Sequence, residues 1–160
     1  MKGLSEKEMK VVSYLELEGK RFFTRDDIKD FFTGPGDMNA YIHRLKEKGR
    51  IIKLNKSKYC LVPIKAYEGN WSEHPFVVVD EMFNGENYCI GGKAAAYYWG
   101  LIEQIPASID VFSKTRQGEK KIFSFKIKIR RVRKIPEYTE GTLDNHRFLV
   151  ATREESRKWI

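Results

Sequence analysis

Three helical patterns followed directly by a hairpin pattern fill the first 62 residues, and this order constrains the fold more than any single residue does. Apolar residues recur at helical spacing after Ser5, over residues 25–32 and after Gly36. Each run is shorter than a helix that is stable alone in water, so the three helices must share one small core. The chain has 160 residues, of which 41% are apolar, which is enough for one ordinary domain or two small ones.

Local signals mark the ends of these helices. Ser5 and Glu8 form the S-x-x-E pattern of a capping box at the start of the first helix. The sequence TGPG at residues 33–36 must end the second helix, because proline cannot continue it and glycine permits the turn. We expect the third helix to begin at Gly36 or Asp37 and to end at Gly49.

The hairpin pattern lies in GRIIKLNKSKYCLV, residues 49–62. Two runs of alternating apolar residues flank Asn55-Lys56-Ser57-Lys58, which is typical of two strands and a turn. The side chains expected to face the helices are Ile52, Leu54, Tyr59 and Leu61. Three helices and a hairpin, with a tight turn between the second and third helices, follow the order of a winged helix-turn-helix. We therefore predict such a domain over residues 1–65.

The predicted third helix and hairpin carry side chains suited to double-stranded DNA. Residues 1–65 contain 15 basic and 9 acidic residues, a net charge of +6 out of +8 for the chain. Asparagine can pair with adenine, arginine with guanine, and lysines of a hairpin can contact phosphates. The candidate residues are Asn39, Ala40, His43, Arg44 and Lys46 on the helix, and Lys53, Asn55, Lys56, Ser57 and Lys58 on the hairpin. An ordinary solvated surface is the alternative for the helix residues taken alone.

A second domain is expected over residues 71–160, after a linker at residues 67–71. The patterns predict helices over 77–83 and 93–102 and strands over 88–90, 107–113 and 121–134, and residues 148–150 fit one more strand. These elements would form a small mixed α/β domain with an antiparallel sheet. The fold class predicted for the whole chain is α+β.

The second domain contains a strongly basic block. Residues 114–134 include ten basic residues and one acidic residue. Apolar residues at 123, 125, 127 and 129 alternate with polar ones, so Lys126, Lys128 and Arg130 should form a basic row that faces away from the core. Same-side residues of a strand repeat at about 6.5 to 7 Å, close to the spacing of phosphates. The row fits a second DNA contact, a contact with RNA or an acidic protein, or a charged edge that prevents aggregation.

Catalytic and metal-binding patterns are not evident in the sequence. His43, His74 and His146 lie far apart, without a cysteine or carboxylate at ligand spacing, and are expected at the surface. Asp80 and Glu81 are adjacent on a predicted helix, where side chains point about 100° apart, so we expect a solvated edge rather than a shared site. We therefore predict no catalytic residues, no bound metal and no cofactor.

The cysteines and the hydropathy indicate a cytoplasmic protein. Cys60 and Cys89 lie in strand-like runs without partners at ligand spacing, so buried reduced thiols are expected. No apolar run approaches the roughly 18 residues that a membrane span needs. The first residues lead into a charged helix rather than a signal peptide.

Two segments resemble the antitoxins of AbiEi type, from type IV toxin-antitoxin and abortive-infection systems. The first is YIHRLKEKGRIIKLNKSKYCLVP, and the second is YCIGGKAAAYYWGL followed by the basic strand IDVFSKTRQGEKKIFSFKIKIRRV. Together they cover roughly residues 23–132. Typical members continue into further helices beyond the equivalent of residues 150–154, so this chain resembles a short member.

The resemblance implies a winged helix that binds inverted repeats in its own promoter and represses the operon. It also implies a C-terminal domain that neutralises a nucleotidyltransferase toxin, without a need for a stable complex. By position, it assigns the DNA-reading and wing roles to Asn39, His43 and Arg44 and to Lys53, Lys56 and Lys58. The expected partner is double-stranded DNA, with a homodimer if the operator is palindromic. The alternatives are a protein-protein interaction adaptor that uses the winged helix, or an RNA-binding accessory factor or nuclease-like enzyme that uses the Lys126, Lys128 and Arg130 row.

Overall fold

The computed structural model describes residues 3–62 and 73–160. The chain divides into two compact units, Met1–Trp71 and Ser72–Ile160. The expected linker at residues 67–71 lies outside the described residues. Both units mix helices and strands, which confirms the predicted α+β class.

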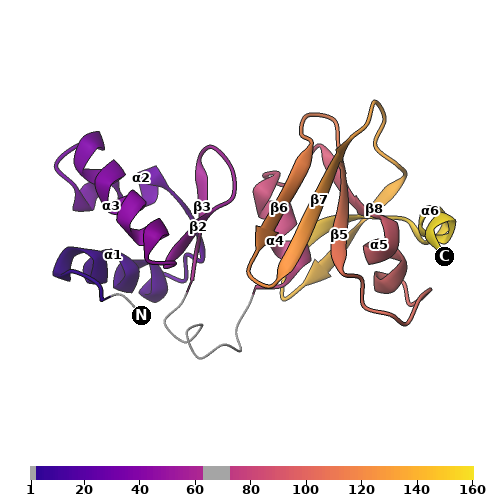
Figure 1. Ribbon diagram of the computed structural model, residues 1–160, viewed down its shortest axis with the longest axis horizontal. Helices are drawn as coiled ribbons and strands as arrows, with labels where there is room; N and C mark the ends of the chain where they lie inside the picture. The colour runs from indigo at the N-terminus through magenta and orange to yellow at the C-terminus, as the bar shows by residue number, and fades with distance from the viewer. Residues whose placement is uncertain (1–2, 63–72) are drawn as a thin grey trace. The chain divides into compact units, whose positions relative to one another are not determined.

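The first unit contains three α-helices and a small antiparallel sheet (Figure 1). Its elements are α1 Glu6–Leu17, β1 Phe22–Thr24, α2 Arg25–Ile28, the 3-10 turn η1 Lys29–Phe31, α3 Pro35–Glu47, β2 Ile51–Lys53 and β3 Lys58–Leu61. The strand order is β1-β3-β2, so the hairpin gains a third strand from the extended segment before α2.

One core joins all of these elements, as the short helices require. Its buried side chains are Val11, Val12, Leu15, Phe23, Ile28, Met38, Ile42, Leu45, Ile51, Tyr59 and Leu61. The predicted capping box is present, with Ser5 and Glu8 bonding to each other's backbone amides. Gly49 has a φ of 71°, the left-handed conformation expected just beyond a helix.

The predicted second helix, over residues 25–32, is shorter in the structure. The α-helix ends at Ile28, and the 3-10 turn η1 follows. The two phenylalanines after it pack on different helices, because the Phe31 ring contacts Tyr14 of α1 and the Phe32 ring contacts Tyr41 of α3. The third helix begins at Pro35, earlier than predicted, because proline is well suited to the first helical position.

The prediction that Ile52 faces the helices was wrong. Ile51 is buried in the core, whereas Ile52 is only partly buried and pairs with Cys60. The prediction counted inward-facing residues back from Leu54, as if Leu54 belonged to the strand. β2 ends at Lys53, so within the strand the inward-facing residue is Ile51 and not Ile52. Leu54, Tyr59 and Leu61 are buried as expected.

The second unit is a six-stranded mixed sheet with helices against it (Figure 1). Its elements are α4 Pro75–Met82, β4 Tyr88–Gly91, α5 Gly92–Tyr98, β5 Ser108–Ser113, β6 Gly118–Ile122, β7 Phe125–Arg131, β8 Tyr138–Leu143, β9 His146–Ala151, α6 Arg153–Ser156 and the 3-10 turn η3 Arg157–Trp159. The strand order is β6-β7-β5-β4-β9-β8. The β4–β9 and β5–β7 pairs are parallel, so the sheet is mostly but not wholly antiparallel.

Aromatic side chains fill the space between the sheet and its first two helices. The Phe148 ring of β9 contacts Phe76 of α4 and Tyr98 of α5 at centroid distances of 5.2 and 5.6 Å. Helix α5 ends at Tyr98, earlier than predicted, and Gly100 follows with a φ of 72°. The strand predicted at residues 148–150 is present within β9.

The predicted strand over residues 121–134 is instead a hairpin of β6 and β7. Phe123 and Ser124 form its turn, and Phe123 has a φ of 54°. Ile122 pairs with Phe125 across this turn. Phe123, which the prediction counted among the inward-facing residues of one long strand, therefore lies in the turn before β7.

Candidate nucleic-acid interface

Helix α3 exposes all five residues that were predicted to contact DNA. Met38, Ile42 and Leu45 are buried, whereas the opposite face of the helix is exposed. The exposed residues include Asn39, Ala40, His43, Arg44 and Lys46. The helical period therefore separated the core face of α3 from its outer face correctly.

Two of these side chains are held by neighbours on α3 itself. The Arg44 guanidinium lies over the Tyr41 ring, 4.2 Å from its centroid. His43 Nε2 lies 3.5 Å from Glu47 Oε1, one helical turn further on. Such contacts limit the rotamers of the two side chains before any partner binds.

A third side chain, Asn39, is held by Arg25 at the start of α2. Arg25 Nη1 donates a hydrogen bond to Asn39 Oδ1, and its Nη2 donates to the Tyr59 hydroxyl at 3.2 Å. Sequence reasoning did not single out Arg25. No local pattern marks it, because its two partners lie 14 and 34 residues away in the sequence.

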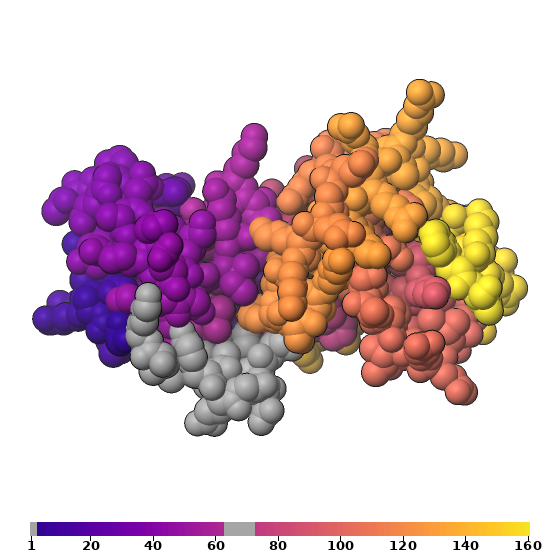
Figure 2. All heavy atoms as spheres, viewed as in Figure 1, coloured from indigo at the N-terminus to yellow at the C-terminus, as the bar shows by residue number. Residues whose placement is uncertain are grey.

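The turn between β2 and β3 is built by two of the predicted wing residues. Asn55 Oδ1 accepts hydrogen bonds from the Ser57 and Lys58 backbone amides at 3.0 and 2.9 Å, and from Ser57 Oγ at 3.3 Å. Asn55 and Ser57 thus shape the tip, which projects from the surface of its unit (Figure 2). Lys53 and Lys56 are exposed, and Lys58 is half-buried.

Several basic groups elsewhere in the first unit are neutralised by acidic residues. Lys7 Nζ lies 3.1 Å from Asp37 Oδ2, and Lys20 Nζ lies 3.2 Å from Asp27 Oδ1. The hydrogen bond from Lys7 lowers the pKa of Asp37 below its ordinary value. Lys7 and Lys20 are thus paired with carboxylates of the same unit.

The basic row of the second unit faces outward, as predicted for β7. Ile127 and Ile129 are buried, whereas Lys126 and Arg130 are exposed and Lys128 is half-buried. The sheet itself compensates part of this charge. Lys126 Nζ lies 3.0 Å from Glu119 Oε2 of β6, and Arg130 Nη2 lies 3.9 Å from Asp110 Oδ1 of β5.

The expectation that Asp80 and Glu81 form a solvated edge was wrong. Asp80 is buried, and its two carboxylate oxygens have different partners. Tyr88 Oη donates to Asp80 Oδ1 at 2.6 Å, and His146 Nε2 lies 3.0 Å from Asp80 Oδ2. His146 Nε2 also lies 3.6 Å from Glu81 Oε1, so the two adjacent carboxylates share one histidine.

This cluster joins α4, β4 and β9. The Leu149 backbone amide donates to Tyr88 Oη at 2.9 Å, and burial together with the bond to Asp80 raises the pKa of Tyr88. The expected surface position of His146 was also wrong, because its side chain is only 21% exposed. Among the described residues, no group of three or more histidine, cysteine, aspartate or glutamate side chains is arranged to hold a metal ion.

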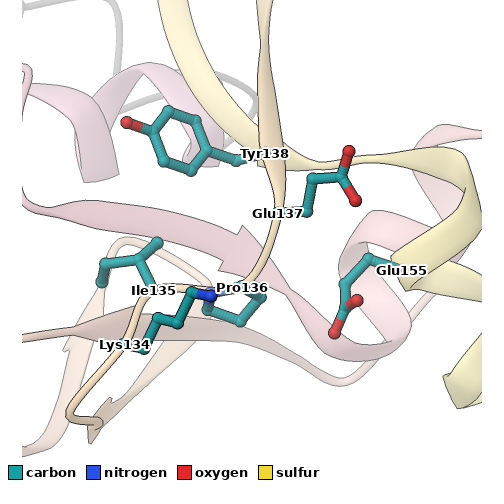
Figure 3. Close-up of a pocket in the computed structure, with 6 residues that line it drawn as sticks. All are labelled: Lys134, Ile135, Pro136, Glu137, Tyr138 and Glu155. Atoms are coloured by element: carbon teal, nitrogen blue, oxygen red, sulfur yellow. The ribbon is translucent and has the colours of Figure 1, made fainter.

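A hollow of about 700 Å³ lies beside the segment that leads into β8 (Figure 3). Its lining residues are Lys134, Ile135, Pro136, Glu137, Tyr138 and Glu155. One ammonium, two carboxylates and a phenol give this lining mixed charge. The hollow therefore does not have the excess of one charge that would favour a strongly anionic or cationic ligand.

Two further expectations concern the cysteines and the membrane. Cys60 and Cys89 are both buried, as predicted. Burial raises the pKa of Cys89 to about 12. Within residues 3–62 and 73–160, no helix combines the length and the apolar character needed to cross a bilayer.

Comparison with known proteins gives a fold relationship. No model of a known protein family matches the chain, and no curated protein matches it. The crystal structure of the RV2827C protein from Mycobacterium tuberculosis is similar to this chain, with a TM-score of 0.57 and 16% sequence identity. The match covers 82% of this chain and 47% of that one, so the chain spans about half the length of its structural neighbour. At this identity the likeness concerns the fold alone.

Proposed function

We propose that the first unit is a winged helix-turn-helix and that the chain is a DNA-binding transcriptional regulator. The element order α1-β1-α2-α3-β2-β3 and the strand order β1-β3-β2 support this assignment. The observation that carries the proposal is the exposed face of α3, with Asn39, His43 and Arg44, followed directly by a lysine-bearing hairpin.

In this proposal α3 enters the major groove and the hairpin lies along the backbone. Arginine and asparagine side chains at the N-terminal and central part of such a helix can reach base edges. Lys53, Lys56 and Lys58 contact phosphates, which positions the helix without reading sequence. Asn55 and Ser57 keep the turn in shape, because they bond to each other and to the backbone at the tip.

The proposed biological role is autorepression of a type IV toxin-antitoxin operon. This role rests on the resemblance to AbiEi-type antitoxins, which also implies a nucleotidyltransferase toxin as the functional counterpart. Inverted repeats in the promoter would be bound by two copies of the chain. The second unit would then serve toxin neutralisation.

The test is binding of the full chain to its own upstream DNA and to a scrambled duplex of equal length, followed by fluorescence anisotropy. A salt series from about 50 to 300 mM separates the phosphate contribution from base reading. We expect a preference for the upstream DNA of about 10³-fold or more, with affinity for both duplexes falling as salt rises.

Equal affinity for both duplexes at every salt concentration would overturn the regulator proposal. Affinity for a protein partner that hardly changes with salt would instead favour the adaptor role. Binding to RNA but not to either duplex would favour an accessory factor that uses the Lys126, Lys128 and Arg130 row.

A further inference from the structure

Arg25 connects the hairpin sheet to the exposed face of α3. Its guanidinium lies 6.0 Å from the centroid of the Tyr59 ring and donates to the Tyr59 hydroxyl at 3.2 Å. Tyr59 is 1% exposed, and its ring stacks on Phe23 in the core. The other end of the guanidinium donates to Asn39 Oδ1. Arg25 is therefore fixed on one side by a buried residue and reaches an exposed one on the other.

The chemistry of the two groups fixes the orientation of the Asn39 amide. A guanidinium has only N–H donors, whereas an asparagine amide has one oxygen acceptor and one NH₂ donor group. Asn39 must therefore turn its oxygen toward Arg25. The NH₂ group then points away from Arg25, on a side chain that is exposed.

This orientation matters because the two purines differ at their major-groove edges. Bidentate pairing with adenine needs the amide oxygen and the NH₂ group together, since adenine presents one acceptor and one donor. Guanine presents two acceptors, N7 and O6. An amide that presents only its NH₂ group can donate to N7 of either purine. Guanine offers a second acceptor, O6, to the other hydrogen, whereas adenine presents an NH₂ group that would find no acceptor there, so guanine is the better match.

We propose that Arg25 is a positioning residue that holds Asn39 as a hydrogen-bond donor, so that Asn39 selects guanine rather than adenine in the DNA site. This inference rests on the proposed function, because it requires that α3 reads base edges. It replaces the general expectation that an asparagine on a recognition helix pairs with adenine.

The first experiment is selection of binding sites from a randomised duplex pool with the full chain and its variants. We expect the wild type to require guanine at one position and Asn39→Ala to lose preference at that position alone. Arg25→Ala should broaden the same position, because the released amide can rotate. Arg25→Lys should retain part of the preference, since an ammonium can also donate to Oδ1.

The second experiment asks whether Arg25 acts through Asn39. In an Arg25→Ala, Asn39→Ala double variant, base preference at that position should equal that of Asn39→Ala alone. Replacing the selected guanine with 7-deazaguanine removes the N7 acceptor. This replacement should weaken binding of the wild type by about 5- to 10-fold and leave binding of Asn39→Ala nearly unchanged.

Lys10→Ala is the matched control, because Lys10 is an exposed basic residue of α1 in the same unit. Circular dichroism and thermal unfolding check that each variant is folded. Selection of adenine at the position read by Asn39, or an unchanged preference in Arg25→Ala, would overturn the inference while leaving the regulator proposal intact. If the wild type shows no sequence preference at all, both this inference and the regulator proposal are overturned.

Discussion

Glu8 closes the first turn of α1 and also binds the end of α3. Its side chain accepts a hydrogen bond from the Ser5 backbone amide, and Lys48 Nζ lies 2.8 and 3.0 Å from its two oxygens. Burial by itself would raise the pKa of Glu8, but the hydrogen bonds from Lys48 and Ser5 lower it below the ordinary value of 4.5. One carboxylate thus serves as a helix cap and as an ion-pair partner.

The stability of the first unit should therefore depend on the charge of Glu8. Because its pKa is lower in the folded state, the pair stabilises the fold above about pH 4.5, and this stability is lost as the pH falls through the folded-state pKa. We expect Glu8→Gln to lower the free energy of unfolding at pH 7 by about 2 to 3 kcal/mol and to flatten its decrease in acid. Urea unfolding measured from pH 7 to pH 3 checks both effects.

Glu6→Gln is the control for this measurement, because Glu6 is exposed in the same turn of α1. Its effect should stay below about 0.5 kcal/mol. Identical acid dependence in the wild type and Glu8→Gln would show that the pair does not contribute.

Gly92 occupies a position where any side chain would be crowded. Its φ is +60°, and an added Cβ would lie 2.4 Å from Asp110 Oδ2 and 2.9 Å from Asp110 Cβ. We expect Gly92→Ala to lower the stability of the second unit by about 2 to 3 kcal/mol, because backbone strain adds to the displacement of Asp110. Thermal unfolding measures the loss.

Gly100→Ala provides the comparison for Gly92→Ala. Gly100 has a φ of +72° but has no atom within 4 Å of an added Cβ. This variant should cost only the backbone strain, about 1 kcal/mol. If the two variants lose the same amount of stability, the Asp110 side chain moves away from the new methyl group at no energetic cost.

At the scale of elements, periodicity predicted helices such as α1 and α3 because each of them buries one face. Continuous apolar runs instead marked α4 and β4, which are buried nearly all round. The same periodicity misled at residues 121–134, where apolar residues continue to alternate through Phe123 and Ser124. This turn has no glycine, asparagine or proline, so nothing in its composition distinguished it from a strand. Only the pairing of β6 with β7 reveals that the chain reverses there.

In the candidate interface, too, the sequence predicted which residues are exposed but not which distant residues contact one another. Exposure on α3 follows from its helical period, which is why Asn39, His43 and Arg44 were identified. Arg25 was missed because its contacts lie 14 and 34 residues away in the sequence. The pairing of His146 with Asp80 spans 66 residues, and no local spacing rule can anticipate a contact of that kind.

The hairpin and α3 should contribute to DNA binding in different ways. Lysines at the tip contact phosphates in the proposed complex, so Lys56→Ala with Lys58→Ala should weaken binding to all duplexes by a similar factor. The dependence of log affinity on log salt should fall by about 1 for each lysine removed. Arg44→Ala should instead cost about 1 to 3 kcal/mol on the preferred duplex and little on a scrambled one.

Anisotropy titrations on both duplexes separate these contributions, with Lys10→Ala as the exposed-lysine control. Effects of the same size and the same sequence dependence from the hairpin and Arg44 variants would refute the division of roles.

At the scale of the whole molecule, each unit has its own core and its own sheet. Leu15 is 1% exposed in the first unit, and Ile90 is 0% exposed in the second. We expect Leu15→Ala to destabilise the first unit by about 2 to 5 kcal/mol without loosening the second, and Ile90→Ala to do the reverse. Hydrogen exchange read residue by residue checks this. Loss of protection in both units from either variant would show that they unfold as one.

The two cysteines give the chain an intrinsic reporter for each unit. Cys60 on β3 and Cys89 on β4 are both 0% exposed, so neither thiol can meet a water-soluble alkylating reagent while its own sheet is intact. The rate at which each thiol is modified therefore measures how often its unit opens. Mass spectrometry of the two peptides would record the opening of both units in a single sample, without any engineered label.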